Sequence, residues 1–320
     1  MYTIVWNGEN DPRACKEILG RVIPDMAEKD PEIVYLDADL MSCIGTLKWG
    51  VTSERAIECG IAEANMIGVA AGLAAQGFKP ICHSFAPFAS RRSFDQIFLS
   101  AGYAKNDITI IGSDPGVTAT MNGGTHMPFE DTAIYRTLPG ATILDVSDPT
   151  QLESVLRQCP DIKGVKYIRV GRKNYQKIYA EGSEFTIGKA VTLKEGKDIV
   201  LFASGIMTGE AMKAAQMLAG QGVDAAVVDC FTVKPLDEEA IIKYARQCGA
   251  AVVAENHNRY GGLFSAVSEV LACNCPIPAA VVAVEDEFGE VGPQGYLQKR
   301  FGLTPEHIVS EALAVLKRKA

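Results

Sequence analysis

The feature that most constrains the fold of this chain is the alternation of short, continuously apolar runs with helix-type patterns. A first series of such runs, rich in β-branched residues, covers residues 32–37, 79–84, 107–112, 141–145 and 165–170. Hydrophobicity that is continuous along a run indicates a strand that is covered on both faces. Helical patterns separate the runs, at about 12–28, 62–75, 92–104 and 149–158. The first part of the chain is therefore predicted to be a parallel α/β domain.

A second series of the same kind follows a polar stretch at residues 172–197. Its strands are expected at 198–203, 225–229, 250–254 and 280–284, and its helices near 208–221, 237–248, 261–272 and 305–318. A chain of 320 residues is long enough for two domains that each bury a core. We therefore expect two α/β domains, with residues 1–185 in the first and residues 186–320 in the second.

Composition excludes several classes of protein. The net charge is −8, with 31 basic and 39 acidic residues and no basic stripe, which argues against a nucleic-acid partner. The N-terminus lacks a basic start followed by an apolar run, and no segment reaches the roughly 18 apolar residues of a membrane span. The nine cysteines include no CxxC pair and are interpreted as buried, reduced thiols. These features predict a cytoplasmic protein that neither enters a membrane nor holds zinc.

Two α/β domains invite the hypothesis of a nucleotide-binding protein, but the glycine motifs for it are absent. Neither domain has a GxGxxG segment after its first strand, and the chain has no GxxxxGK[ST] segment. This argues against a Rossmann dehydrogenase. The pair Gly261-Gly262 opens a helix, and we interpret it as close packing of a strand against that helix.

The segment from Gly60 to Ala75 places one carboxylate, Glu63, at the head of an otherwise apolar helix of small residues. Burying an unpartnered carboxylate is costly, so Glu63 is expected either to be paired or to be tuned for proton chemistry. The alternative is that Glu63 only complements the helix dipole. Gly68 and Gly72 on the same helix would let another backbone approach closely, which suggests a subunit interface.

Three further groups of residues follow predicted strands of the first domain. Phe85 and Phe88 form an aromatic pair followed by two arginines, where a flat ring could stack, although the pair could also fill the core. A glycine-rich loop, residues 122–125, delivers His126 after the strand at 107–112, where α/β folds place ligand loops. Arg172 follows the strand at 165–170, and a guanidinium there suits a phosphate or carboxylate group.

Together these segments resemble the C-terminal half of transketolase, in the split form where that half is a separate chain. Gly60-Ile-Ala-Glu63-Ala-Asn-Met resembles the segment with the family's catalytic glutamate, and Phe85 and Phe88 fall where the family stacks aromatic rings on its cofactor. The resemblance runs essentially end to end. Further matches are Gly124-Thr125-His126 with Glu130-Asp131, Asp11-Pro12-Arg13, and Ala38-Asp39-Leu40.

The resemblance implies thiamine diphosphate as cofactor. A carboxyl at Glu63 would share a proton with the pyrimidine ring nitrogen and so stabilise the imino form of the cofactor, and His126 would hydrogen-bond the sugar as charge develops. Glu63 and His126 are thus the implied catalytic residues. The implied cofactor-binding residues are Ile61, Glu63, Phe85, Phe88, Arg91 and Asp39, with Arg92 as the alternative to Arg91 after a one-residue slip. The implied substrate-binding residues are Arg13, Asp114, Asn122, His126 and Arg172.

One part of the family site is missing from the sequence. The chain has no Gly-Asp-Gly segment followed by the family's Asn, which together hold Mg and the diphosphate, and no metal ligand is assigned here. The resemblance therefore implies a partner, the transketolase N-terminal subunit, with Mg held by that subunit. The expected assembly is a homodimer or an α2β2 heterotetramer.

Two departures from the family pattern bear on the substrate, a sugar or a sugar phosphate. Asp114 stands where transketolases commonly carry a phosphate-contacting His, and Asn122 stands where they carry an Asp. An acid repels phosphate, although deoxyxylulose phosphate synthases of the same superfamily also carry an acid nearby. The acceptor could therefore be an unusual or unphosphorylated sugar.

Three other functions stay open on this sequence. Two are related thiamine enzymes, a deoxyxylulose phosphate synthase-like enzyme or the beta subunit of a 2-oxo acid dehydrogenase. The Thr125-His126 loop with Glu130-Asp131 favours transketolase over both. The third is a non-catalytic scaffold subunit that keeps the fold.

Overall fold

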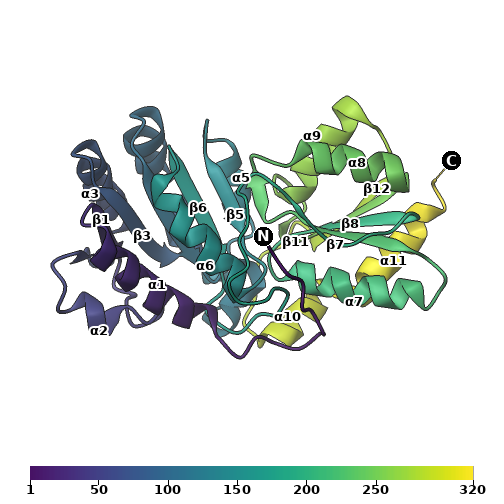
Figure 1. Ribbon diagram of the computed structural model, residues 1–320, viewed down its shortest axis with the longest axis horizontal. Helices are drawn as coiled ribbons and strands as arrows, with labels where there is room; N and C mark the ends of the chain where they lie inside the picture. The colour runs from purple at the N-terminus through teal and green to yellow at the C-terminus, as the bar shows by residue number, and fades with distance from the viewer. Residues whose placement is uncertain (320) are drawn as a thin grey trace.

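The computed structural model describes residues 1–319 and places two α/β domains next to each other (Figure 1). The first contains a seven-stranded sheet in the order β10-β5-β6-β4-β3-β1-β2. All neighbouring pairs in it are parallel except β10 and β5. The strands are β1 (Ile33–Asp37), β2 (Ala56–Glu58), β3 (Lys79–Phe85), β4 (Ile108–Ser113), β5 (Thr142–Asp145), β6 (Val165–Val170) and β10 (Thr232–Lys234).

Helices cover both faces of this sheet, as the continuous hydrophobicity of its strands requires. The helices are α1 (Cys15–Lys29), α2 (Leu47–Gly50), α3 (Glu63–Ala75), α4 (Phe94–Gln96), α5 (Asp131–Arg136) and α6 (Pro149–Gln158). Tyr35 and Ile81 pack with α1 and α6 in one core cluster, whereas Leu36 and Cys82 pack with α3 in the other. Alternate residues of one strand therefore enter opposite cores.

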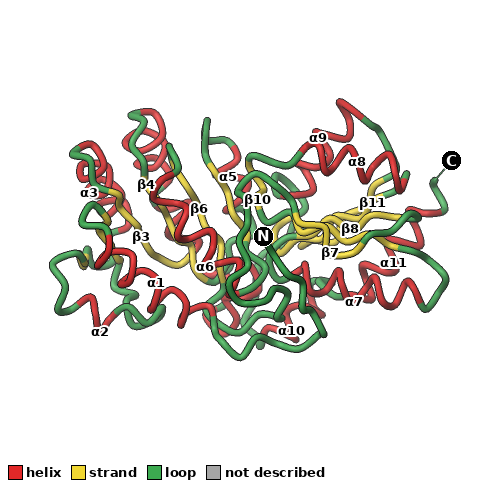
Figure 2. The backbone as a smooth tube through the Cα atoms, in the orientation of Figure 1, coloured by secondary structure: helices red, strands yellow, loops and turns green. Residues whose placement is uncertain are grey.

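The second domain repeats this plan with a five-stranded sheet in the order β12-β11-β8-β9-β7. Only β7 is antiparallel to its neighbour. Figure 2 shows this sheet close to edge-on, with α8 and α9 on one side and α7 and α11 on the other. The elements are β7 (Val191–Lys194), β8 (Ile199–Ala203), α7 (Met207–Ala219), β9 (Ala225–Asp229), α8 (Glu238–Cys248), β11 (Ala251–Asn258), α9 (Leu263–Asn274), β12 (Ala279–Val284), α10 (Gln294–Arg300) and α11 (Pro305–Leu316).

The prediction of two α/β domains is confirmed, and the differences lie in short elements. Strands β2, β7 and β10 are short edge strands that are only partly buried, and they were not predicted because they lack a continuous apolar run. The start of α6 agrees with the sequence: Pro149 is its first residue, and the Asp148 carboxylate accepts a hydrogen bond of 2.8 Å from the Gln151 N–H.

The helix expected at 92–104 is instead a run of π-helical turns at 88–92 and 97–103, with the short α4 between them. Ser93 donates its hydroxyl to the Phe88 carbonyl at 3.1 Å, and Ser90 donates to the Ala86 carbonyl at 2.6 Å. Side-chain hydroxyls that bond carbonyls of the preceding turn compete with the α-helical ladder. Wide π turns of this kind are frequent at functional sites.

Two other expectations can be compared with the structure. All nine cysteines are free, but the prediction that they are buried is wrong for Cys273, which is exposed near the C-terminal end of α9, and Cys43, Cys59 and Cys275 are only partly buried. The predicted packing of a strand against the helix holds for Gly262, where a Cβ would meet Glu255 of β11, whereas a Cβ at Gly261 would meet Ala133 of α5 in the first domain. None of the helices within residues 1–319 has both the length and the apolar character needed to cross a bilayer.

Candidate active site

The candidate site lies at the C-terminal edge of the first sheet, where β3, β4 and β6 end. Phe85 is the last residue of β3, and Arg172 follows β6 by two residues. Glu63 is the first residue of α3, a helix that packs against β3. Parallel α/β sheets bind ligands at this edge, since the loops that follow the strands gather there.

Glu63 is buried and paired, which is one of the two outcomes expected for it. Its side chain is 2% exposed. One carboxylate oxygen accepts a hydrogen bond of 2.9 Å from the Arg92 guanidinium and a longer one of 3.5 Å from the Ser84 hydroxyl. The position at the head of α3 adds the favourable end of the helix dipole. The carboxylate is therefore held as an acceptor at the floor of the site.

Phe85, Phe88 and His126 form an aromatic cluster beside this carboxylate. The ring centroids of Phe85 and Phe88 are 6.4 Å apart, and the His126 ring meets both rings edge-on, at 5.9 Å and 5.1 Å. The guanidinium carbon of Arg92 lies 3.8 Å from the Phe88 ring centroid. The structure thus brings together the predicted aromatic pair and the predicted histidine, which come from different loops.

The two adjacent arginines have different partners. Arg91 binds the Glu130 carboxylate at 2.6 Å and the Thr125 carbonyl at 3.0 Å, so it ties the turn that carries His126 to the π-helical segment. Arg92 is the one that contacts Glu63 and Phe88. The geometry therefore brings the alternative residue, Arg92, to the carboxylate, and a direct role of Arg91 in cofactor binding stays a prediction.

The environment of His126 favours the neutral imidazole. Burial, followed by the positive charges of Arg92 and Arg91, lowers the pKa of His126. Its Nδ1 lies 3.0 Å from the Thr125 hydroxyl. A neutral ring has one N–H to donate and one nitrogen to accept, so it suits a hydrogen bond to a sugar oxygen at neutral pH.

Arg172 lies on the other side of Phe85 and is neutralised by Asp114. The Arg172 guanidinium donates to one Asp114 oxygen through Nε and Nη2, both at 2.6 Å, and the guanidinium carbon lies 4.9 Å from the Phe85 ring centroid. Although burial opposes the shift, the hydrogen bond and charge of Asp114 raise the pKa of Arg172. Asp114 is 3% exposed and has a left-handed φ of 57°. Such strain in a non-glycine residue persists where surrounding contacts impose it, often at functional sites.

Four other predicted residues lie at the rim or elsewhere. Ile61 is 75% exposed, and Asn122 is exposed at the end of the loop that leads to His126. Asp39 is exposed with a φ of 63°, and its N–H donates to Glu58 at 2.8 Å.

Arg13 binds Asp11 through two hydrogen bonds and the Thr150 hydroxyl through a third. Within residues 1–319, the hydrogen bonds and ion pairs of Arg13 do not extend to Glu63 or His126.

Sequence reasoning missed several residues that shape this edge. Ser84 bonds Glu63, and Glu58 holds the backbones of both Asp39 and Gly60. The second domain contributes Asn256, which bonds the loop after β4. The polar cluster at 255–258, directly after an apolar run, was the sequence signal from which Asn256 could have been predicted.

Among residues 1–319, no group of three or more His, Cys, Asp or Glu side chains is arranged to hold a metal ion.

The residues present fit the pyrimidine half of thiamine diphosphate. The Arg92 guanidinium, a flat group with N–H donors, lies over Phe88 and donates to Glu63. A protonated pyrimidine would make the same two kinds of contact, stacking on the aromatic ring and donating to the carboxylate. The fold is that of the thiamine diphosphate-dependent enzymes, and the residues at this edge are compatible with that cofactor.

Comparison with known proteins narrows the class to one family. The family model of the transketolase pyrimidine binding domain matches residues 11–177, and the model of the transketolase C-terminal domain matches residues 188–308. The chain therefore belongs to the transketolase family and carries these two of its domains.

Similar proteins include subunits of divided transketolases. The 6-deoxy-6-sulfo-D-fructose transketolase subunit SqwH of Clostridium sp. (strain MSTE9) is 50% identical over 92% of this chain and 92% of its own. One of the subunits of the apulose-4-phosphate transketolase of Phocaeicola vulgatus is 33% identical over 97% of this chain and 99% of its own. A solved structure, described as a split gene transketolase in an inactive beta4 tetramer, superposes with a TM-score of 0.88 at 36% identity, over 96% of this chain and 99% of that one.

Proposed function

We propose that this chain is the C-terminal (beta) subunit of a thiamine diphosphate-dependent transketolase, which transfers a two-carbon ketol unit from a ketose donor to an aldose acceptor. The buried Glu63 beside the Phe88 ring carries the proposal, because it offers a carboxylate acceptor and a stacking surface to one flat heterocycle. The names of the two subunits similar over nearly their whole length support the same reaction.

Each residue of the cluster has a part in this proposal. When bound, thiamine diphosphate supplies the acidic carbon that takes up the ketol unit. Glu63 holds a proton at the pyrimidine ring nitrogen, and Phe85 and Phe88 keep water from that ring. Neutral His126 hydrogen-bonds the donor sugar at the oxygen where charge develops. Asp39 and Ile61 lie at the rim, where they would contact the cofactor from outside.

The proposal includes a partner, a transketolase N-terminal subunit that holds Mg and the diphosphate, in an α2β2 heterotetramer. Two observations support it. Gly68 and Gly72 leave an exposed face on α3, where an added Cβ would meet nothing within 4 Å. The solved relative made only of beta chains is described as inactive. The cofactor would then lie between the two kinds of chain.

For the substrate, we propose a sugar that carries either a group with a single negative charge or no charged group. Asp114 already neutralises Arg172, so a dianionic phosphate would meet a carboxylate as well as a guanidinium. A sulfonate carries one charge and keeps three acceptor oxygens. The name of the relative that is 50% identical, a sulfofructose transketolase subunit, agrees with this choice.

The proposal also includes a domain boundary and a cellular location. We place the division between the domains near residue 185, in the segment between β6 and β7 that separates the two sheets. The nine free cysteines fit a reducing compartment and so support a cytoplasmic location.

The test is reconstitution. The chain is mixed with the N-terminal subunit of its own organism, thiamine diphosphate and Mg, and ketol transfer is assayed from sulfofructose and from fructose 6-phosphate. We expect activity only from the pair, and a loss of at least about 100-fold for Glu63→Gln, the size typical of removing acid–base assistance. Glu54→Gln, which changes an exposed carboxylate nine residues earlier in the chain, is the matched control. Full activity of Glu63→Gln, or activity of this chain alone, would overturn the proposal.

The same assay separates the other functions. Oxidative decarboxylation of a 2-oxo acid in the presence of a lipoyl-domain partner would indicate a dehydrogenase beta subunit. Condensation of pyruvate with glyceraldehyde 3-phosphate would indicate a deoxyxylulose phosphate synthase-like enzyme. A native pair that binds thiamine diphosphate but transfers nothing would leave the scaffold role.

A further inference from the structure

We propose that Asn256 of the second domain is a positioning residue for the loop that carries Asp114, Asn122 and His126. The second domain would then set the geometry of the sugar-binding side of the site, in addition to any part in assembly. The link to sugar binding rests on the proposed function, whereas the effect on the loop itself does not.

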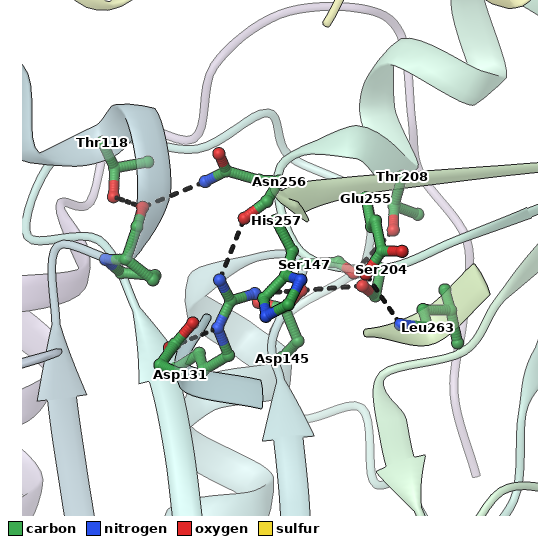
Figure 3. Close-up of polar contacts among 12 residues, drawn as sticks. Thr118, Asp131, Asp145, Ser147, Ser204, Thr208, Glu255, Asn256, His257 and Leu263 are labelled. Carbon is green, nitrogen blue, oxygen red and sulfur yellow. Dashed lines mark hydrogen bonds and ion pairs between the residues drawn. The ribbon is translucent and has the colours of Figure 1, made fainter. Parts of the chain in front are cut away.

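Asn256 binds the first turn of this loop with both ends of its side-chain amide. Its Oδ1 accepts from the Val117 N–H at 3.0 Å. Its Nδ2 donates to the Pro115 carbonyl at 3.0 Å, the bond drawn from the Asn256 side chain in Figure 3. The side chain is 3% exposed. Buried hydrogen bonds of this kind fix geometry strongly, because breaking them leaves polar groups without partners.

The loop backbone is shaped to receive this amide. Gly116, between the two bonded residues, has a φ of 55°, and a Cβ on it would overlap Asn256 Oδ1. Thr120 further along has a φ of 51°, and Asp114 at the start has 57°. Glycine adopts such a φ readily, whereas the left-handed φ values of Asp114 and Thr120 are costly and need surrounding contacts to persist.

Asn256 is itself anchored to the first sheet. Arg169 of β6 donates to the Asn256 backbone carbonyl at 2.9 Å and forms ion pairs with Asp131 at 2.7 Å and Asp145 at 2.9 Å. In Figure 3, the Asn256 carbonyl and the Asp131 carboxylate are joined by dashed lines to the same guanidinium, that of Arg169. The amide is therefore held at a fixed place relative to the strands that end at the site.

The far end of the loop meets the second domain again. A Cβ on Gly124 would overlap the Gly289 carbonyl, and one on Gly123 would lie 2.8 Å from Val291 Cγ2. Gly124 begins the single turn that ends at His126. The segment between β12 and α10 thus backs the turn that presents His126, and the loop is held at both ends by the same domain.

The first experiment measures amide hydrogen exchange of the full chain without partner. In Asn256→Ala we expect exchange at least about tenfold faster in peptides covering 114–127, with other peptides unchanged. Asn258→Ala is the matched control, because this asparagine of the same strand bonds Asp286 and Tyr260 within its own domain. Unchanged exchange in the loop would overturn the proposal. Should Asn256→Ala not fold, Val291→Ala, an exposed site, must speed exchange at 122–126.

The second experiment uses the reconstituted pair. Asn256→Ala is expected to lower kcat/KM for the ketose donor by at least about fivefold, while the Kd for thiamine diphosphate changes less than twofold. Equal losses in cofactor and donor binding would mean general damage and would contradict a positioning role. A native pair without ketol transfer, combined with a faster loop in Asn256→Ala, would reject the proposed function and leave the loop assignment intact.

Discussion

The Arg92 guanidinium lies over the Phe88 ring, with 3.8 Å between the guanidinium carbon and the ring centroid. The same guanidinium donates to the buried carboxylate of Glu63. Arg92 thus covers the surface where the proposed cofactor ring would stack, and it must turn aside when that ring binds. The Arg92 side chain is 45% exposed, so it can turn toward solvent.

Removing Arg92 should destabilise the chain when no cofactor is bound. In Arg92→Ala, Glu63 keeps only the Ser84 contact, so we expect the free energy of unfolding to fall by about 1–3 kcal/mol, the cost of an unsatisfied buried group. Arg91→Ala breaks an ion pair between half-exposed groups and should cost less than about 1 kcal/mol. Urea unfolding of both variants checks this, and a larger loss in Arg91→Ala would refute the ranking.

His126 should titrate below the usual range of a histidine. Burial and the charges of Arg92 and Arg91 lower its pKa, so its ring stays neutral as the pH falls through 6.5. The chain has four histidines, which makes their ring resonances assignable by NMR. We expect the titration midpoint of His126 to rise in Arg92→Gln, because a positive charge is removed. A midpoint that does not move would show that Arg92 has no electrostatic influence on the ring.

Asp114→Asn should shift substrate preference toward phosphates. The amide keeps the size of the side chain and tolerates a left-handed φ, while the charge beside Arg172 is removed. We expect KM for fructose 6-phosphate to fall by about tenfold and KM for sulfofructose to change less, because a dianion gains more from the freed guanidinium. Steady-state kinetics of the reconstituted pair measures both values. An equal change for the two sugars would argue against selection by charge.

The pH dependence of stability should reveal two buried neighbours with opposite titrations. Burial lowers the pKa of His257 to about 4 from 6.5, so the unfolded chain binds a proton first and stability falls as the pH drops from 6.5 toward 4. Burial raises the pKa of Glu255 to about 7 from 4.5, so the folded chain binds the proton first and stability rises as the pH drops from about 7 toward 4.5. The two contributions oppose each other in the native chain.

His257→Gln removes one of the two contributions. Between pH 6.5 and pH 5, we expect the free energy of unfolding of this variant, relative to the native chain, to increase by about 1–2 kcal/mol. His307→Gln, which replaces a histidine with a partly exposed side chain, serves as the control for the loss of a histidine elsewhere. Urea unfolding at the two pH values gives the result, and parallel curves for His257→Gln and the native chain would contradict the assignment.

The sequence alone allowed us to predict the long helices and strands, and also those site residues that lie within recognisable motifs. The apolar runs predicted the central strands of both sheets, since continuous hydrophobicity requires cover on both faces. Glu63, Phe85, Phe88 and His126 could be proposed as one site because the segments that carry them resemble segments of a single family.

Pairings between distant segments were beyond a single sequence. The choice between Arg91 and Arg92 depends on the π-helical turns at 88–92, which rotate the two side chains relative to an α-helix. Asn256 lies more than 100 residues from the loop it bonds, so only the packed domains bring them together. The three-residue strand β10 carries no periodic signal, and its partner β5 lies in the other domain.

Strand β10 also affects how this protein can be engineered. Its residues 232–234 come after the first strands of the second domain, yet they pair with β5 and close one edge of the first sheet. A chimera that exchanges everything after residue 185 therefore replaces that edge as well. A fragment that ends at residue 185 would leave the backbone hydrogen-bonding groups at one edge of β5 without a partner. Such an unpaired edge strand can pair with another molecule and cause aggregation. Grafts should transfer β10 together with the pyrimidine-binding domain.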